Sequence, residues 1–238
     1  MNSKKSKRRF RITTFRIFLM ASFLAFIANG FYQVWQKPAE VFSLVGLGQA
    51  KTPYQTWVTY KDQFHAYETP TISAELLASL AHIESNGNPL ATPGWTFRLS
   101  SNWDQVFAPA TSAVGLFQFT NGTFEMAKQW CDQSPQCPSS WFYSRLWPEH
   151  SIRLAANYLN RSLREVLPLS NMELPEQVKQ QVVGIIHLCG KGKGLKFVRS
   201  GFSLDTVGYC GAHNARSYVN QLHSLNRQFI RIAAKNSY

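Results

Sequence analysis

An apolar stretch of 18 residues, Ile17–Val34, follows directly on a strongly basic segment. Residues 1–16 contain seven Lys or Arg side chains and no acidic one, so they carry a charge of +7. Positive charge before an apolar run is typical of a secretory signal, or of a membrane anchor whose N-terminus stays in the cytoplasm. Ala28-Asn29-Gly30 offers a small-x-small cleavage site. Because the basic segment is long for a signal and the apolar run is nearly long enough to span a bilayer, we favour an uncleaved anchor.

Charge and hydropathy divide the chain into segments and narrow its possible partners. A basic cluster could bind nucleic acid, but the adjoining apolar run indicates a membrane, so we expect no nucleic-acid partner. The whole chain carries +12, which leaves 12 − 7 = +5 for the remaining 222 residues. The sequence predicts a basic cytoplasmic region, a signal or anchor, a partly helical spacer and one main domain, over residues 1–16, 17–34, 35–69 and 70–238.

The main domain is predicted to be mainly α-helical, because its apolar residues recur at helical spacing. Ile152, Ala155, Leu159 and Leu163 form one such stripe, and no strand pattern of comparable strength occurs. Pro and Gly residues stand where helices begin and end. The expected helices cover residues 73–86, 122–132, 148–165, 175–188 and 213–234.

Glu84 lies near the end of the first of these helices, within the stripe that contains Leu77 and Leu80. A carboxylate on an apolar face is costly to ionise, so we expect its pKa to rise. A raised pKa suits a general acid that works near neutral pH. Periodicity alone favours a structural role, an inward-leaning Glu that pairs with an Arg or caps a backbone NH, and the neighbouring residues reverse that preference.

The residues around Glu84 resemble the soluble lytic transglycosylase family. Glu84–Pro89 is similar to its Glu-Ser and Asn-Pro turn, and Ser112–Phe119 to its Gly-Leu-Met-Gln block. Three later pieces follow in the family's order: Asn121–Thr123, Ala155–Leu159 and His187–Gly192. The resemblance covers roughly residues 70–232, and two linked blocks with the same downstream order are fairly specific.

This resemblance implies a lysozyme-like helical domain that cleaves the β-1,4 bond of peptidoglycan with one Glu. In the family, the same Glu protonates the leaving oxygen and then takes a proton from the C6 hydroxyl of the muramoyl sugar, closing a 1,6-anhydro ring. Glu84 would be catalytic. Residues Ser85, Gly115, Phe117, Gln118 and His187 would bind or border the glycan. The +5 charge would suit this anionic polymer.

The chain departs from the family's pattern in several places. His187 replaces a Tyr whose hydroxyl lies near the catalytic Glu, although Ala212–Ala215 also resembles that segment. Phe117 takes the family's Met position. Gly115 follows Glu84 by 31 residues, about twice the family's spacing, and this insertion contains Trp95, Phe97, Trp103 and Phe107. These aromatic residues could wall the glycan groove or could pack against the domain.

All four cysteines follow the apolar run, and an even number in an exported chain suggests disulfides. Three pairings are possible. We favour Cys131–Cys137, which closes a tight loop, and Cys189–Cys210, which ties the glycine-rich segment to the last helix. The spacings match no zinc pattern, so we expect no metal and no cofactor.

Several functions remain open at this point. The favoured one is a lytic transglycosylase in the periplasm, anchored in the inner membrane or released by cleavage. Asp104, in the insertion, is the one serious candidate for a second carboxylate that would make the protein a muramidase. A glycan-binding part of an envelope-spanning assembly, including secretion or conjugation machinery, is a third possibility. A thiol enzyme using Cys189 with His187 or His213 is the fourth, and disulfide pairing would exclude it.

Overall fold

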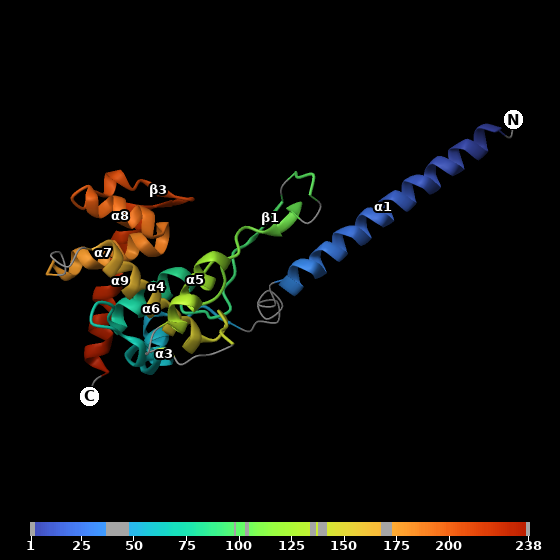
Figure 1. Cartoon of the computed structure of the whole chain (residues 1–238). Coiled ribbons are helices and arrows are strands. Elements are labelled where there is room, and N and C mark those ends of the chain that lie inside the picture. The colour runs from blue at the N-terminus through green and yellow to red at the C-terminus, as the bar shows by residue number, and fades with distance from the viewer. Residues whose placement is uncertain are drawn as a thin grey trace.

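The computed structural model describes residues 3–36, 48–97, 99–102, 105–133, 137, 142–167 and 173–236, with the backbone alone for 3–13 and 33–36. The expected mainly helical fold with an apolar N-terminal helix is confirmed. Helix α1, Ser3–Gln36, extends away from the rest of the molecule as a single long rod (Figure 1). Its residues Thr14–Tyr32 are long and apolar enough to cross a membrane, and only 6% of that segment is buried.

The five helices expected in the main domain are present. They are α4, Ala74–Ser85; α5, Asn121–Asp132; α6, Pro148–Val166; α7, Glu176–Cys189; and α9, Ala215–Lys235. Their starts follow local chemistry. Ser73 accepts a hydrogen bond from the Leu76 NH at the start of α4, and Pro148 occupies the first turn of α6.

Helix α3, Pro53–Tyr67, lies in the segment that we expected to be a partly helical spacer. Trp57, Tyr60 and Phe64 on this helix are buried in the same core as α4, α6 and α9. A capping box at Thr52 and Gln55 begins the helix. The core of the domain therefore begins before residue 70.

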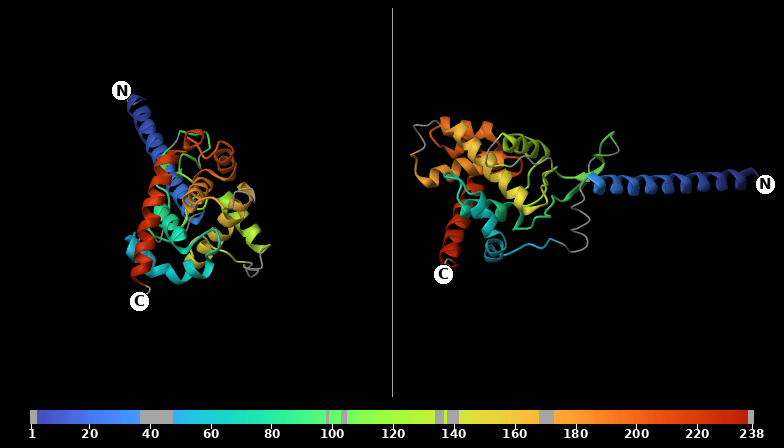
Figure 2. Two further views of the ribbon diagram at one scale, coloured as in Figure 1. Left: turned by 90° about the vertical axis from the view of Figure 1, so that its left-hand side faces the viewer. Right: turned by 60° about the horizontal axis from the view of Figure 1, so that its bottom comes forward.

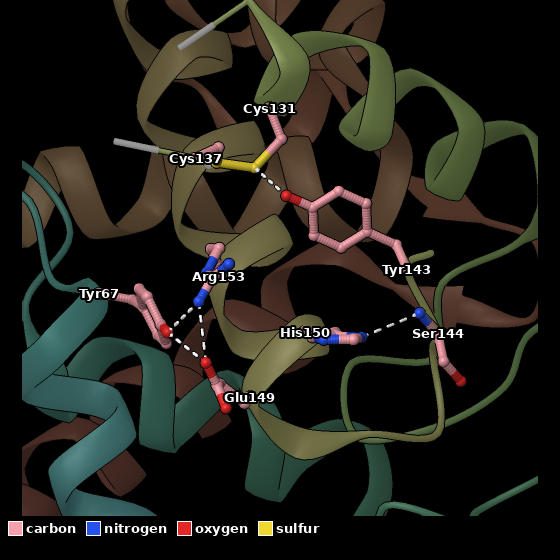
Figure 3. Close-up of polar contacts among 8 residues, drawn as sticks. All are labelled: Tyr67, Cys131, Cys137, Tyr143, Ser144, Glu149, His150 and Arg153. Carbon is pink, nitrogen blue, oxygen red and sulfur yellow. Dashed lines mark hydrogen bonds and ion pairs between the residues drawn. A yellow bond between two sulfur atoms is a disulfide. The ribbon is translucent and has the colours of Figure 1, made fainter. Parts of the chain in front are cut away.

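Polar contacts also fasten α3 to α6 (Figure 3). The Tyr67 hydroxyl donates to Glu149 Oε1 at 2.7 Å, and Arg153 bonds both the Tyr67 hydroxyl and Glu149. In the same view, the Tyr143 hydroxyl lies 3.7 Å from the sulfur of Cys131. The contacts of Tyr67 with Glu149 and Arg153 hold α3 against α6.

Helix α8, Lys191–Arg199, was not predicted. Its sequence contains Gly192 and Gly194, which normally disfavour helices. The structure supplies the reason for Gly194, since a Cβ there would lie 2.6 Å from Cγ1 of Ile186 on α7. Close packing of α8 on α7 therefore requires a residue that weakens the helical pattern.

Two short hairpins and one 3₁₀ turn complete the described structure. Strands β1, Trp95–Phe97, and β2, Phe107–Pro109, pair antiparallel, as do β3, Tyr209–Cys210, and β4, His213–Asn214. The turn η3 covers Leu204–Thr206. The β1–β2 hairpin projects from the domain towards the end of α1 (Figure 1, and the right-hand view of Figure 2).

Candidate active site

Glu84 is placed at the mouth of a pocket by the way α4 ends. The helix stops because Asn86 adopts a left-handed conformation, with φ of 49°, and Gly87 follows with φ of 67°. A Cβ on Gly87 would lie 2.3 Å from the hydroxyl of Thr56, so only glycine fits there. The turn leaves the Glu84 side chain 18% exposed, one turn beyond the fully buried Leu80.

Two side chains from distant parts of the chain contact the carboxylate. The Tyr218 hydroxyl, from the first turns of α9, donates to Glu84 Oε1 at 2.6 Å. Nε2 of His187, near the end of α7, lies 3.4 Å from the same oxygen. His187 is 6% exposed and its ring packs against Phe117 and Phe119. The carboxylate is therefore held between one side chain from α9 and one from α7.

The pKa of Glu84 moves in the direction opposite to our prediction. Burial raises it, as expected. However, the hydrogen bonds from His187 and Tyr218 and the electrostatic influence of His187 and His213 lower it, and the net pKa lies below the ordinary value. The predicted rise is wrong because it counted burial alone.

Tyr218 remains a hydrogen-bond donor over the whole neutral range. Burial, together with the negative charge and hydrogen bond of Glu84, raises the pKa of Tyr218 well above its usual value. Sequence analysis missed this residue, because its position in the apolar stripe of the last helix favoured a role in the core. A Tyr within a stripe of aliphatic residues is the signal that could have found it, since its hydroxyl needs a partner when buried.

The pocket has a volume of about 480 Å³. It lies where α4, α7 and α9 meet the segment before α5, and Glu84 is the one acidic residue among the described residues that line it. His187, His213 and Tyr218 also line it. The remaining lining residues are Ile83, Pro93, Thr111, Ala113, Gln118, Phe119, Thr120, Thr123, Leu188 and Gln221.

Gln118 lines the pocket and is fixed in place. Its backbone has φ of 47°, and its amide nitrogen donates to the carbonyls of Ala91 and Gly115 at 2.9 and 2.8 Å. Because both amide hydrogens are used, the side-chain oxygen is the group left to accept a hydrogen bond from a ligand.

The other predicted binding residues lie behind the pocket wall. Ser85 is buried, and its hydroxyl lies 2.8 Å from the Ala81 carbonyl and 2.9 Å from that of Leu116. Phe117 is 1% exposed and belongs to the core. Gly115 has φ of 86°, and a Cβ there would lie 2.1 Å from the Arg145 carbonyl. All three support the loop that carries Gln118, and contact with a glycan stays a prediction for them.

Both favoured disulfides are present, Cys131–Cys137 and Cys189–Cys210. The second joins the end of α7, two residues beyond His187, to the β3–β4 hairpin, which carries His213. It therefore links the two segments whose histidines face Glu84. All four cysteines are paired, so a thiolate nucleophile is excluded in this state.

The insertion does not wall the pocket with its described aromatic rings. Trp95, Phe97 and Phe107 are outside the pocket lining, whereas Pro93 and Thr111, at the base of the hairpin, are part of it. Trp103 and Asp104 lie outside the described residues, so the idea of Asp104 as a second carboxylate stays a prediction. Within the described part of the chain, no group of three His, Cys, Asp or Glu residues could hold a metal ion.

Comparison with known proteins identifies the domain. Residues 63–172 match the family model of the Transglycosylase SLT domain. The match contains Glu84 and Gln118 and ends before His187 and Tyr218, which the fold brings to the same pocket. A search of curated proteins found no match. Residues 63–172 therefore match the family that the motifs of this chain resemble.

Proposed function

We propose that the protein is a lytic transglycosylase that cleaves the MurNAc-β-1,4-GlcNAc bond of peptidoglycan and leaves 1,6-anhydro-muramoyl ends. The SLT domain supports action on peptidoglycan. The observation that carries the finer proposal is the single carboxylate: Glu84 is the one acid among the described pocket residues, and Tyr218 and His187 hold it. Hydrolysis with inversion or through a glycosyl-enzyme uses two carboxylates.

In the proposed reaction, Glu84 gives its proton to the glycosidic oxygen while the bond from C1 to that oxygen breaks. The C6 hydroxyl oxygen of the muramoyl sugar then bonds to C1, and its proton returns to Glu84. Atoms balance without water, and the carboxyl group ends as it began. Gln118 offers an acceptor oxygen at the pocket wall, which suits a sugar hydroxyl or an acetamido NH.

Tyr218 is proposed to position Glu84 for both proton transfers. Hydrogen bonds to charged groups contribute about 1.5–3 kcal/mol, which corresponds to roughly 10- to 100-fold in rate. We expect Tyr218→Phe to lower kcat by that range with a smaller change in KM, as measured by muropeptide release. Tyr209→Phe, at a side chain 65% exposed, is the matched control and should leave kcat unchanged. Equal rates for the two variants would contradict a positioning role.

His187 sets the pH range over which Glu84 can act as an acid. Glu84 donates only while protonated, and that fraction falls as the pH rises through its pKa. Because His187 lowers this pKa, His187→Gln should raise it and move the alkaline limb of the kcat/KM profile to higher pH. His65→Gln, at an exposed His, should leave the profile in place. A limb that stays put or moves to lower pH in His187→Gln would count against this assignment.

The same proposal places the domain in the periplasm, held to the inner membrane by α1. A basic N-terminus before the apolar span favours a cytoplasmic start. Asn29, inside the possible cleavage site, is 3% exposed and donates to the Phe107 carbonyl at 3.0 Å. That contact with the domain favours an uncleaved helix.

Carrying out the reaction in water labelled with oxygen-18 distinguishes a transglycosylase from a hydrolase. A transglycosylase takes no oxygen from the solvent, so the released muropeptides should carry no heavy oxygen at C1. Incorporation of solvent oxygen at C1 of each new muramoyl end would mean hydrolysis and would direct attention to Asp104. Binding of glycan strands with no release of fragments would indicate a component that recognises peptidoglycan without cutting it.

A further inference from the structure

One face of the β1–β2 hairpin is apolar and partly exposed to solvent. In its register, Phe97 stands opposite Phe107 and Trp95 opposite Pro109, so all four side chains share one face. The rings of Trp95 and Phe107 stack with centroids 4.9 Å apart. Phe97, by contrast, is 67% exposed, and Leu99, just beyond β1, is 96% exposed. An isolated two-stranded hairpin is marginal in water, so this one calls for a surface to pack on.

Part of that surface is provided by α1, near its C-terminal end. The ring of Phe107 lies 5.3 Å from that of Phe26, and Asn29 donates to the Phe107 carbonyl at 3.0 Å. A polar side chain inside an apolar span is costly unless it finds a partner, and the hairpin backbone supplies one. The hairpin thus packs laterally on the helix that would cross the membrane.

The position of this contact along α1 places the hairpin at the membrane surface. The apolar span ends at Tyr32. At about 1.5 Å per residue, Asn29 lies roughly 4.5 Å and Phe26 roughly 9 Å inside that end. This is the zone between headgroups and acyl chains, where aromatic side chains accumulate in membrane proteins. Side chains that extend sideways from the hairpin at this height meet lipid.

We propose that the β1–β2 hairpin lies in the periplasmic interface of the membrane crossed by α1, with Phe97 and Leu99 inserted among the lipids. The inference rests on the proposed anchoring by α1. The hairpin is continuous with the pocket, because its base is closed by the Ala110 NH donating to the Gly94 carbonyl at 2.8 Å. Pro93 and Thr111, the residues just outside that bond, line the pocket. Lipid contact at the hairpin therefore sets the pocket beside the membrane surface.

The test uses the full chain in vesicles of phosphatidylethanolamine and phosphatidylglycerol. A polarity-sensitive NBD dye is attached to Leu99→Cys and, in a separate sample, to Ile230→Cys. Ile230 is the matched control, an apolar side chain 50% exposed on the far part of α9. The four native cysteines are paired and do not take the label. Because Leu99 is almost fully exposed, the substitution leaves the fold intact, and muropeptide release checks this for each sample.

We expect the label at position 99 to fluoresce at shorter wavelength, to be quenched by doxyl groups carried on lipids and to resist aqueous iodide severalfold better than the label at 230. A second label at Phe97→Cys should behave like that at 99. Equal accessibility of positions 99 and 230 in chains that float with the vesicles would overturn the hairpin inference while leaving the anchor in place. Chains that do not float would contradict the anchoring itself, and with it the inference.

Discussion

Glu84→Gln is expected to lower the rate of peptidoglycan cleavage by about 10²- to 10⁴-fold, the usual contribution of general acid–base catalysis. The amide keeps the shape of the side chain and can still accept the hydrogen bond from Tyr218. It has no proton to give to the glycosidic oxygen and cannot take one from the C6 hydroxyl. Both halves of the reaction therefore fail together. The measurement is the initial rate of muropeptide release from purified peptidoglycan at saturating substrate.

A matched carboxylate on the same domain separates this effect from a general loss of charge. Glu176 stands at the start of α7, the helix whose other end carries His187, and its side chain is 58% exposed. Glu176→Gln should retain the full rate. Glycan binding, measured by pelleting with insoluble peptidoglycan, should persist in Glu84→Gln. A Glu84→Gln variant that cuts at the native rate would remove this residue from the mechanism.

The second large effect is expected at Gly115. Its φ of 86° is strained for any residue with a side chain, and a Cβ would lie 2.1 Å from the backbone carbonyl of Arg145. Backbone cannot move aside as a flexible side chain does. Combining the left-handed conformation with overpacking, we expect Gly115→Ala to lower the free energy of unfolding by about 3 kcal/mol.

This change should also reach the active site. The Arg145 guanidinium donates to the carbonyls of Ser112 and Phe119, each at 2.9 Å, and so clamps the loop that carries Gln118. Displacing Arg145 therefore displaces a pocket wall, and we expect KM to rise as well. Gly122→Ala is the control, because a Cβ there meets nothing within 4 Å. The free energies of unfolding of both variants are measured by chemical denaturation, and equal values would refute the steric argument.

The helices could be predicted from the sequence because each buries a stripe of apolar residues at helical spacing. The sequence also singles out Glu84 as the candidate acid, since it combines a carboxylate at the end of such a stripe with a Glu-Ser block and a Gly-Leu-x-Gln block, and the structure places this residue in a pocket. Periodicity did not predict α8, because close packing on Ile186 requires Gly194 and glycine weakens the helical pattern. That requirement comes from tertiary contact, which spacing along the chain does not encode.

The electrostatics of the site could not be predicted from local pattern. The pKa of Glu84 depends on His187 and Tyr218, which follow it in the chain by 103 and 134 positions and meet it only in the folded domain. Burial was foreseeable, but these partners reverse its effect. The insertion poses a similar problem. Its aromatic residues are evident in the sequence, but the contact of Phe107 with Phe26 and the hydrogen bond from Asn29 to the Phe107 carbonyl depend on where the domain sits relative to α1.

The central claim is that one carboxylate, Glu84, cleaves the glycan strand without water. The most direct measurement is mass spectrometry of the fragments that the full chain, reconstituted in vesicles, releases from purified peptidoglycan, with Glu84→Gln and Asp104→Asn in parallel. We predict 1,6-anhydro-muramoyl ends from the native chain and from Asp104→Asn, and their loss in Glu84→Gln. Reducing muramoyl ends that depend on Asp104 would contradict the single-carboxylate mechanism.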